Sequence, residues 1–148
     1  MLDPSKSKAE MAKHMANYFN AISSEYQPLD TSTIPETFRA DLPSLTEQEV
    51  VKKIKKMKKK TSSVPGDISP HLYESYADLL ATPITAIFNQ ITRSKEWPDL
   101  WKTEHVTIIP KNSNSTTAEE CRNLSCTNFL SKVYESFVLD WARTQVTA

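Results

Sequence analysis

The 148-residue chain contains one glycine, Gly66, against nine prolines. The P-loop and the dinucleotide-binding fingerprint each need several glycines, because the backbone comes close to phosphate at positions where a Cβ would intrude. Neither motif can occur in this sequence. A nucleotide that binds to this chain must therefore be held by side chains.

The length suits one domain with a substantial core, which buries roughly 70% of the surface that the unfolded chain exposes. Cys121 and Cys126 fit no common zinc spacing and cannot form a disulfide framework, so we expect two reduced thiols. The first residues lack the basic-then-apolar order of a signal peptide, and no apolar run approaches the ~20 residues that cross a bilayer. We therefore expect an intracellular protein, of the nucleus or the cytoplasm, with no membrane partner.

The positive charge is concentrated in one segment, although the 18 basic and 18 acidic residues of the chain balance. Residues 1–50 carry four bases and eight acids, and residues 61–148 carry seven bases and ten acids. The ten residues between them include seven lysines, which are Lys52, Lys53, Lys55, Lys56, Lys58, Lys59 and Lys60. A helix this basic can follow nucleic-acid phosphates while its apolar stripe packs on the protein. A solvated helix face or a localisation signal remains the alternative.

Apolar residues recur at steps of three and four along most of the chain, which predicts amphipathic helices. Thr46 and Glu49 have the spacing of a capping box and mark one helix start. Ser69-Pro70 and Thr82-Pro83 each place a capping residue before a proline, so a helix of about a dozen residues is expected after Ser69 and another from Pro83. Helices are expected over residues 8–22, from 46 to a frayed end near 60, from 70, from 83, and from about 127 onward. In the helix from Pro70, we expect Leu72, Tyr73, Tyr76, Leu79 and Leu80 to face inward.

One strand is expected over residues 103–109, where β-branched residues alternate, and residues 123–126 are expected to pair with it. The fold class is therefore mostly α with a small β-hairpin (α+β). Residues 23–44 are rich in Pro, Ser and Thr and predict an extended linker. The expected organisation is an amphipathic helix in residues 1–22, this linker, and one folded region over residues 45–148.

No constellation of catalytic or metal-binding residues is recognisable. A two-metal site needs carboxylates that converge on ions about 3.5–4 Å apart, and the acids here are scattered along polar stretches. His14, His71 and His105 lie far apart, each without a recognisable ligand or nucleophile beside it. We therefore expect no catalytic and no metal-binding residues in this chain by itself.

Five landmarks follow one another in order after the lysine-rich segment. They are the turn Ser62-Ser63-Val64-Pro65-Gly66-Asp67-Ile68, the pair Phe88-Asn89, the segment Trp97-Pro98-Asp99-Leu100-Trp101-Lys102, the strand end Ile109-Pro110-Lys111, and Arg122-Asn123-Leu124-Ser125 with Lys132 and Glu135 downstream. In order and spacing they resemble the start of the reverse transcriptase domain of non-LTR (LINE-like) retrotransposons, over about residues 46–148. The sequence departs from the family at Val64, where the family has glycine, at Gly66 and Asp67, which are transposed, and at Asn123, which replaces proline.

The resemblance implies the fingers subdomain of a right-hand polymerase that copies RNA into DNA. Carried over by position, Lys111 and Arg122 would contact the triphosphate of the incoming deoxynucleoside triphosphate. The lysines from Lys52 to Lys60 would lie near the backbone of the RNA template or DNA primer. The palm, where the aspartates of the family hold Mg²⁺, is absent from the chain, so we expect a catalytically incomplete fragment that binds no cofactor by itself.

A different class of function is a non-enzymatic interaction module, a relic of such an element. In that case apolar helix faces that once packed on the palm would bind a protein partner or a second copy of the chain. A free-standing enzyme is the least favoured reading.

Overall fold

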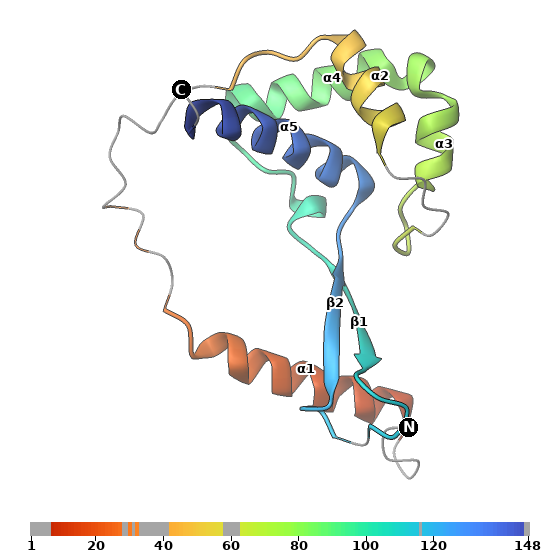
Figure 1. The fold of residues 1–148 in the computed structure, drawn as a ribbon, viewed down its shortest axis with the longest axis vertical. Coiled ribbons are helices and arrows are strands. Elements are labelled where there is room, and N and C mark those ends of the chain that lie inside the picture. The colour runs from red at the N-terminus through yellow and green to blue at the C-terminus, as the bar shows by residue number, and fades with distance from the viewer. Residues whose placement is uncertain are drawn as a thin grey trace. The chain divides into compact units, whose positions relative to one another are not determined.

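The computed structural model describes residues 7–27, 30, 32, 42–57, 63–115 and 117–146. It is mostly helical with a small two-stranded antiparallel sheet, which confirms the expected α+β class (Figure 1). The chain divides into two compact units. We call residues 1–39 with 106–125 the hairpin unit, and residues 40–105 with 126–148 the helical unit.

The helical unit surrounds one aromatic core. Its elements are α2 (Glu47–Lys56), α3 (Pro70–Ser75), α4 (Ala77–Ser94), the 3₁₀ helix η3 (Asp99–Trp101) and α5 (Phe129–Val146). Phe88 of α4 is fully buried, and its ring centroid lies 5.3 Å from that of Tyr134 and 6.1 Å from that of Trp101. The hydroxyls of Tyr134 and Thr92 are hydrogen-bonded at 2.9 Å, so the buried phenol has a polar partner. These rings join α4, η3 and α5 into one core.

Two long-range polar contacts fix the ends of helices in this unit. The Asn89 side chain accepts from the Leu45 amide at 2.8 Å and donates to the Leu45 carbonyl at 2.9 Å, which ties the segment before α2 to α4. The Asp67 carboxylate accepts from the Phe129 amide at 2.8 Å and so caps α5 from a turn far away in sequence. Gly66 shapes that turn with a φ of +84°, which a residue with a Cβ adopts only with strain.

The hairpin unit contains α1 (Lys8–Ser24) and, apart from one end residue of each, the strands β1 (His105–Pro110) and β2 (Cys121–Cys126). Just beyond the strands, the Lys111 amide donates a hydrogen bond to the Glu120 carbonyl. Because residues that share such a bond lie opposite each other in an antiparallel pair, Ile109 lies opposite Arg122. Met15 of α1 is buried with Cys121, and the partly buried hydrophobic residues Tyr18, Phe19 and Ile108 pack against this small core. Both cysteines are free thiols, as expected.

The helix expected over residues 8–22 is confirmed and continues to Ser24, two residues into the expected linker, and the pairing of the two strands is confirmed. The helix from Pro70 is wrong in length, because α3 ends at Ser75 and α4 begins at Ala77. No new helix opens at Pro83, which lies inside α4. Pro83 leaves the Leu79 carbonyl without its helical donor, but both residues are exposed, so water can reach this side of the helix.

The changed helix boundary also corrects which residues face inward. Tyr73 is buried and Leu80 partly buried, as expected, whereas Leu72, Tyr76 and Leu79 are exposed. The α2 helix ends at Lys56, and the fraying expected near Lys60 lies outside the described residues, as does most of the linker expected over residues 23–44.

We predict that Phe88→Ala lowers the free energy of unfolding by about 3–5 kcal/mol, because it removes the ring at the centre of the aromatic core. Urea unfolding followed by circular dichroism measures the loss. Leu79→Ala, on the exposed side of the same helix, is the control and should change stability by no more than about 0.5 kcal/mol. Equal effects of the two substitutions would contradict this description of the core.

Candidate nucleic-acid interface

The α2 helix positions the described part of the lysine-rich segment. The expected capping box is present: the Glu49 carboxylate accepts from the Thr46 amide at 2.8 Å, and the Thr46 hydroxyl accepts from the Glu49 amide at 3.3 Å. Val50 and Ile54 are fully buried against the rest of the unit. Because these two residues fix one face of α2 on the core, the helix must present its lysines on its other faces.

Two of the four described lysines of α2 have acidic partners on other helices. The Lys53 amine lies 2.5 Å from a carboxylate oxygen of Asp140 on α5, and 4.6 Å from the centroid of the Phe137 ring. The Lys55 amine lies 2.7 Å from a carboxylate oxygen of Asp78 on α4. These contacts fasten α2 to its neighbours in addition to any role toward a ligand.

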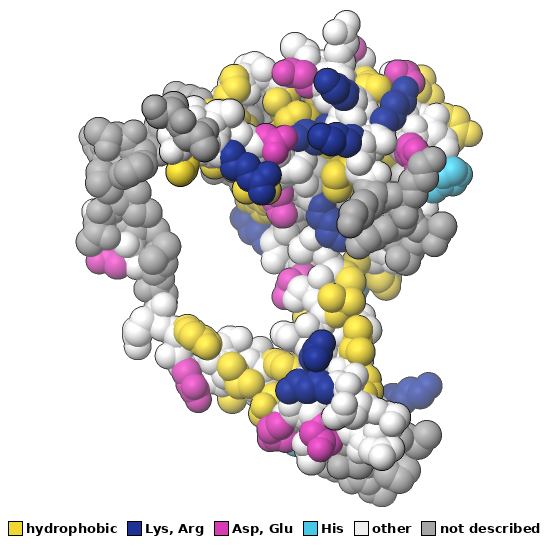
Figure 2. Space-filling view, in the orientation of Figure 1, with side chains coloured by type: hydrophobic (Ala, Val, Ile, Leu, Met, Phe, Trp, Pro, Cys, Tyr) yellow, Lys and Arg dark blue, Asp and Glu magenta, His cyan; other side chains and the backbone are white. Residues whose placement is uncertain are grey.

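Lys52 and Lys56 are exposed, and Lys58, Lys59 and Lys60 lie outside the described residues. Figure 2 shows Lys and Arg side chains gathered on the visible face of the helical unit, over α2 and α5, with acidic side chains between them. The local surface is therefore less positive than the lysine count of the segment suggests.

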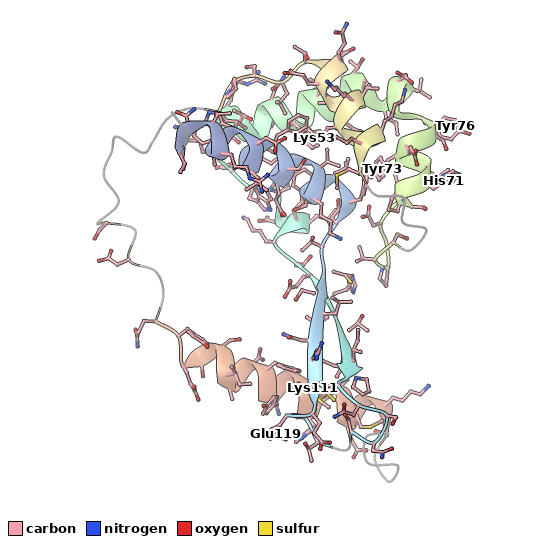
Figure 3. All side chains as sticks on the ribbon, viewed as in Figure 1. Lys53, His71, Tyr73, Tyr76, Lys111 and Glu119 are labelled. Carbon is pink, nitrogen blue, oxygen red and sulfur yellow. The ribbon has the colours of Figure 1, made fainter. Side chains whose placement is uncertain are left out.

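Lys111 and Arg122 belong to the hairpin unit and lie toward the closed end of the β-hairpin. Lys111 follows β1, and its amine donates to the Glu119 carbonyl at 2.5 Å, next to the labelled Glu119 in Figure 3. Arg122 is exposed at the second position of β2. Side chains alternate along a strand, so Arg122 points away from the face that Cys121 presents to α1.

The acidic and aromatic partners of Lys53 were missed by the sequence analysis. Asp140 follows Lys53 by 87 residues, and no local spacing links them. The hydrogen bond from the Lys53 ammonium, and then its positive charge, lower the pKa of the Asp140 carboxyl. The charges of Arg143 and Lys56 lower this pKa further by smaller amounts. Three cations therefore act on this one acid.

Neither a metal centre nor a membrane span is found in the described part of the chain. Its His, Cys, Asp and Glu side chains do not gather in any group of three that could hold a metal ion. Its helices are also not long and apolar enough to cross a bilayer.

A cavity of about 840 Å³ lies in the helical unit, where the end of α4 meets η3. Its lining is mixed, with Ile87 and Trp97 beside the charged residues Lys95, Glu96 and Lys102. None of the site residues expected from the sequence lines it.

A scan against protein-family models and a search of curated proteins found no match to this chain. The resemblance to reverse transcriptases therefore depends on the five sequence landmarks alone.

We predict that Glu49→Gln makes stability less sensitive to acid. Hydrogen bonds from the Thr46 side chain and then its amide lower the pKa of Glu49 from 4.5. A lowered folded-state pKa means that the stabilisation is complete above the unfolded-state value and is lost as the pH falls through the folded-state value. Urea unfolding at about pH 7 and about pH 3 should show a smaller loss for Glu49→Gln than for the wild type.

Glu47→Gln serves as the control for the capping box. Glu47 lies in the same first turn of α2 but is not part of the capping box. This variant should lose stability on acidification as the wild type does. The same acid dependence in the wild type and in Glu49→Gln would show that the capping box contributes nothing to it.

Proposed function

We propose that this chain is the fingers-like part of an RNA-directed DNA polymerase of the non-LTR retrotransposon class, acting inside the cell, in the nucleus or the cytoplasm. The observation that carries the proposal is the set of five landmarks in family order. Residues from four of these landmarks also make contacts in the helical unit. Asp67, from the first landmark, caps α5. The rings of Phe88, Trp97 and Trp101, from the second and third landmarks, pack with Tyr134, which lies between Lys132 and Glu135 of the last one. Landmarks that pack together are expected if they come from one ancestral subdomain.

In this proposal, the α2 lysines contact the phosphate backbone of the RNA template or the DNA primer. Lys52 and Lys56 are exposed, and the buried stripe of Val50 and Ile54 holds the helix in place beneath them. Each phosphate that a lysine neutralises releases condensed counterions, so the binding weakens steeply as salt is added.

Lys111 and Arg122 contact the triphosphate of the incoming deoxynucleoside triphosphate. An arginine fork and a lysine point charge both suit phosphate oxygens and need no glycine-rich loop. The Lys111 amine would exchange a neutral carbonyl acceptor, Glu119, for a charged phosphate oxygen, and hydrogen bonds between charged groups are the stronger kind.

Binding and positioning are the only roles assigned to the residues of this chain. Bond formation in the resembled family requires Mg²⁺ and the aspartates of the palm. The described residues do not provide a group of side chains that fits such an ion, so no catalytic step is derived from them.

We predict that the double variant Lys52→Gln/Lys56→Gln binds RNA more weakly and with less dependence on salt. The slope of log K against log salt should become shallower by about 1.4, since each lost phosphate contact on a single strand removes about 0.7. Fluorescence anisotropy of a labelled single-stranded RNA of about 20 nucleotides, titrated with the full chain at several salt concentrations, measures both quantities.

The matched control for this variant is Lys8→Gln/Lys13→Gln, which removes the same charge from α1. It should leave the salt slope close to that of the wild type. An equal loss of affinity in both double variants would show that the effect comes from net charge alone. Folded wild-type protein that binds no RNA would contradict the role of the lysines.

We predict that Lys111→Gln and Arg122→Gln each weaken the binding of a deoxynucleoside triphosphate by about tenfold, the size expected for one hydrogen bond to a charged group. Isothermal titration calorimetry on the full chain measures the affinity. Lys102→Gln, which removes an exposed cation from the helical unit, is the control and should bind as the wild type does. If all three variants bind equally well, the triphosphate role of the hairpin is wrong.

A protein-interaction module is the second candidate function, and exposed apolar side chains favour it. Ile68, Leu72, Tyr76, Leu79 and Ile87 follow one another at steps of three, four or eight residues, and all five are exposed. Figure 3 shows Tyr76 at the outer edge of the helical unit, near α3. Exposed apolar side chains that gather in a large patch mark sites of protein interaction. A folded chain that binds neither RNA nor triphosphate but self-associates would favour this candidate.

A further inference from the structure

The ion pair between Lys53 and Asp140 lies between two short rows of charged residues. Lys56 follows Lys53 by three residues on α2, and Arg143 follows Asp140 by three residues on α5. Side chains three residues apart on a helix are neighbours on its surface. The Lys53–Asp140 contact at 2.5 Å joins one residue of each row, and the charges of Arg143 and Lys56 both act on the Asp140 carboxyl.

The two rows contain three cations and one acid. Lys56 and Arg143 are exposed, and the Asp140 side chain is 61% exposed, so all of these groups can reach solvent. The Lys53 side chain is only 16% exposed, and its ammonium group lies over the Phe137 ring. The four side chains therefore place three cationic groups around one carboxylate, with the Lys53 ammonium held against an aromatic ring.

Such a cluster is suited to a phosphate group. One phosphodiester carries a single negative charge and several acceptor oxygens, and an arginine fork with two ammonium groups supplies donors from different directions. Asp140 offers Lys53 the same kind of acceptor oxygen that a phosphate would offer. The Asp140 side chain is 61% exposed, so a phosphate can approach Lys53 from the side of the carboxylate that it would replace.

We propose that Lys53, Lys56 and Arg143 form a binding site for one phosphate group of an RNA backbone, and that Asp140 weakens this binding by holding Lys53 when no RNA is present. The inference depends on the proposed function, which it extends from α2 to α5. It adds Arg143 to the interface and gives Asp140 the role of a competing anion.

The test compares the affinity of the full chain for the same labelled single-stranded RNA in the wild type, in Asp140→Asn and in Asp140→Asn/Arg143→Gln. Asp140→Asn keeps the shape of the side chain and removes the competing charge, while the Phe137 ring still supports the Lys53 ammonium. We expect Asp140→Asn to bind the RNA several-fold more tightly than the wild type at low salt. Arg143→Gln in the same chain should remove most of that gain.

Asp99→Asn is the matched control. It removes one exposed carboxylate that is also paired with a lysine, Lys102, but on η3 instead of α5. An equal gain in Asp140→Asn and Asp99→Asn would reduce the effect to net charge and overturn the inference, as would no gain in Asp140→Asn. Unchanged circular dichroism and urea midpoints would show that the substitutions act on binding and not on folding.

A second arm tests whether the extra affinity comes from a phosphate-binding site. Inorganic phosphate is added at the same ionic strength as a chloride control. We expect phosphate, but not chloride, to remove the gain of Asp140→Asn, and a gain that phosphate leaves unchanged would overturn the inference. If neither the wild type nor Asp140→Asn binds RNA, the proposed function and this inference fail together, whereas a wild type that binds RNA with no selective gain in Asp140→Asn overturns the inference alone.

Discussion

The burial of Phe88 among three rings from two other elements is the interaction on which the helical unit depends. Tyr134 and Phe137 of α5 and Trp101 of η3 all contact this ring. The same cluster extends to the surface, because Phe137 also lies beneath the Lys53 ammonium. The position of a surface cation on α2 is thus determined by the packing of the core, and a charged side chain held in this way loses less entropy on binding than a freely moving one.

Several residues that carry the resemblance to reverse transcriptases have a structural role. Asp67 caps a helix, Asn89 binds the backbone of Leu45, and Trp97 and Trp101 pack in the aromatic core. A fold can be kept by such contacts while the chemistry that it once supported changes or disappears. Lys111 and Arg122 are exposed in the other unit, where packing requires neither charge.

The parts of the fold that depend on local chemistry could be predicted from the sequence. The capping box of Thr46 and Glu49 marked the start of α2, and the β-branched residues before Pro110 marked the first strand. The boundary between α3 and α4 was misplaced, because Pro83 was taken as a helix start and Ser69 as a side-chain cap that the structure does not have. Proline and serine are both common at helix starts, but this is only a general preference. Ala77, Ala81 and Ile84 are buried, and their packing holds one continuous helix on the core in spite of Pro83.

The candidate site was less predictable, because its main contacts join residues that are distant in sequence. The lysines were visible as a run of like charges, but a run does not reveal which of its members have partners. Lysines three and four residues apart on α2 repel one another, and this repulsion destabilises an isolated helix.

Asp140 and Asp78 offset that repulsion from neighbouring helices, so the same acids that allow a lysine-rich helix to fold also compete with any phosphate that approaches it. The stability of α2 and its affinity for a polyanion are therefore opposed. A bound nucleic acid would take the place of the acids as the partner of the lysines. It would then also stabilise the helix, because a ligand that binds only the folded state raises its stability. Binding of this kind gives a physical reason for so many like charges on one short helix.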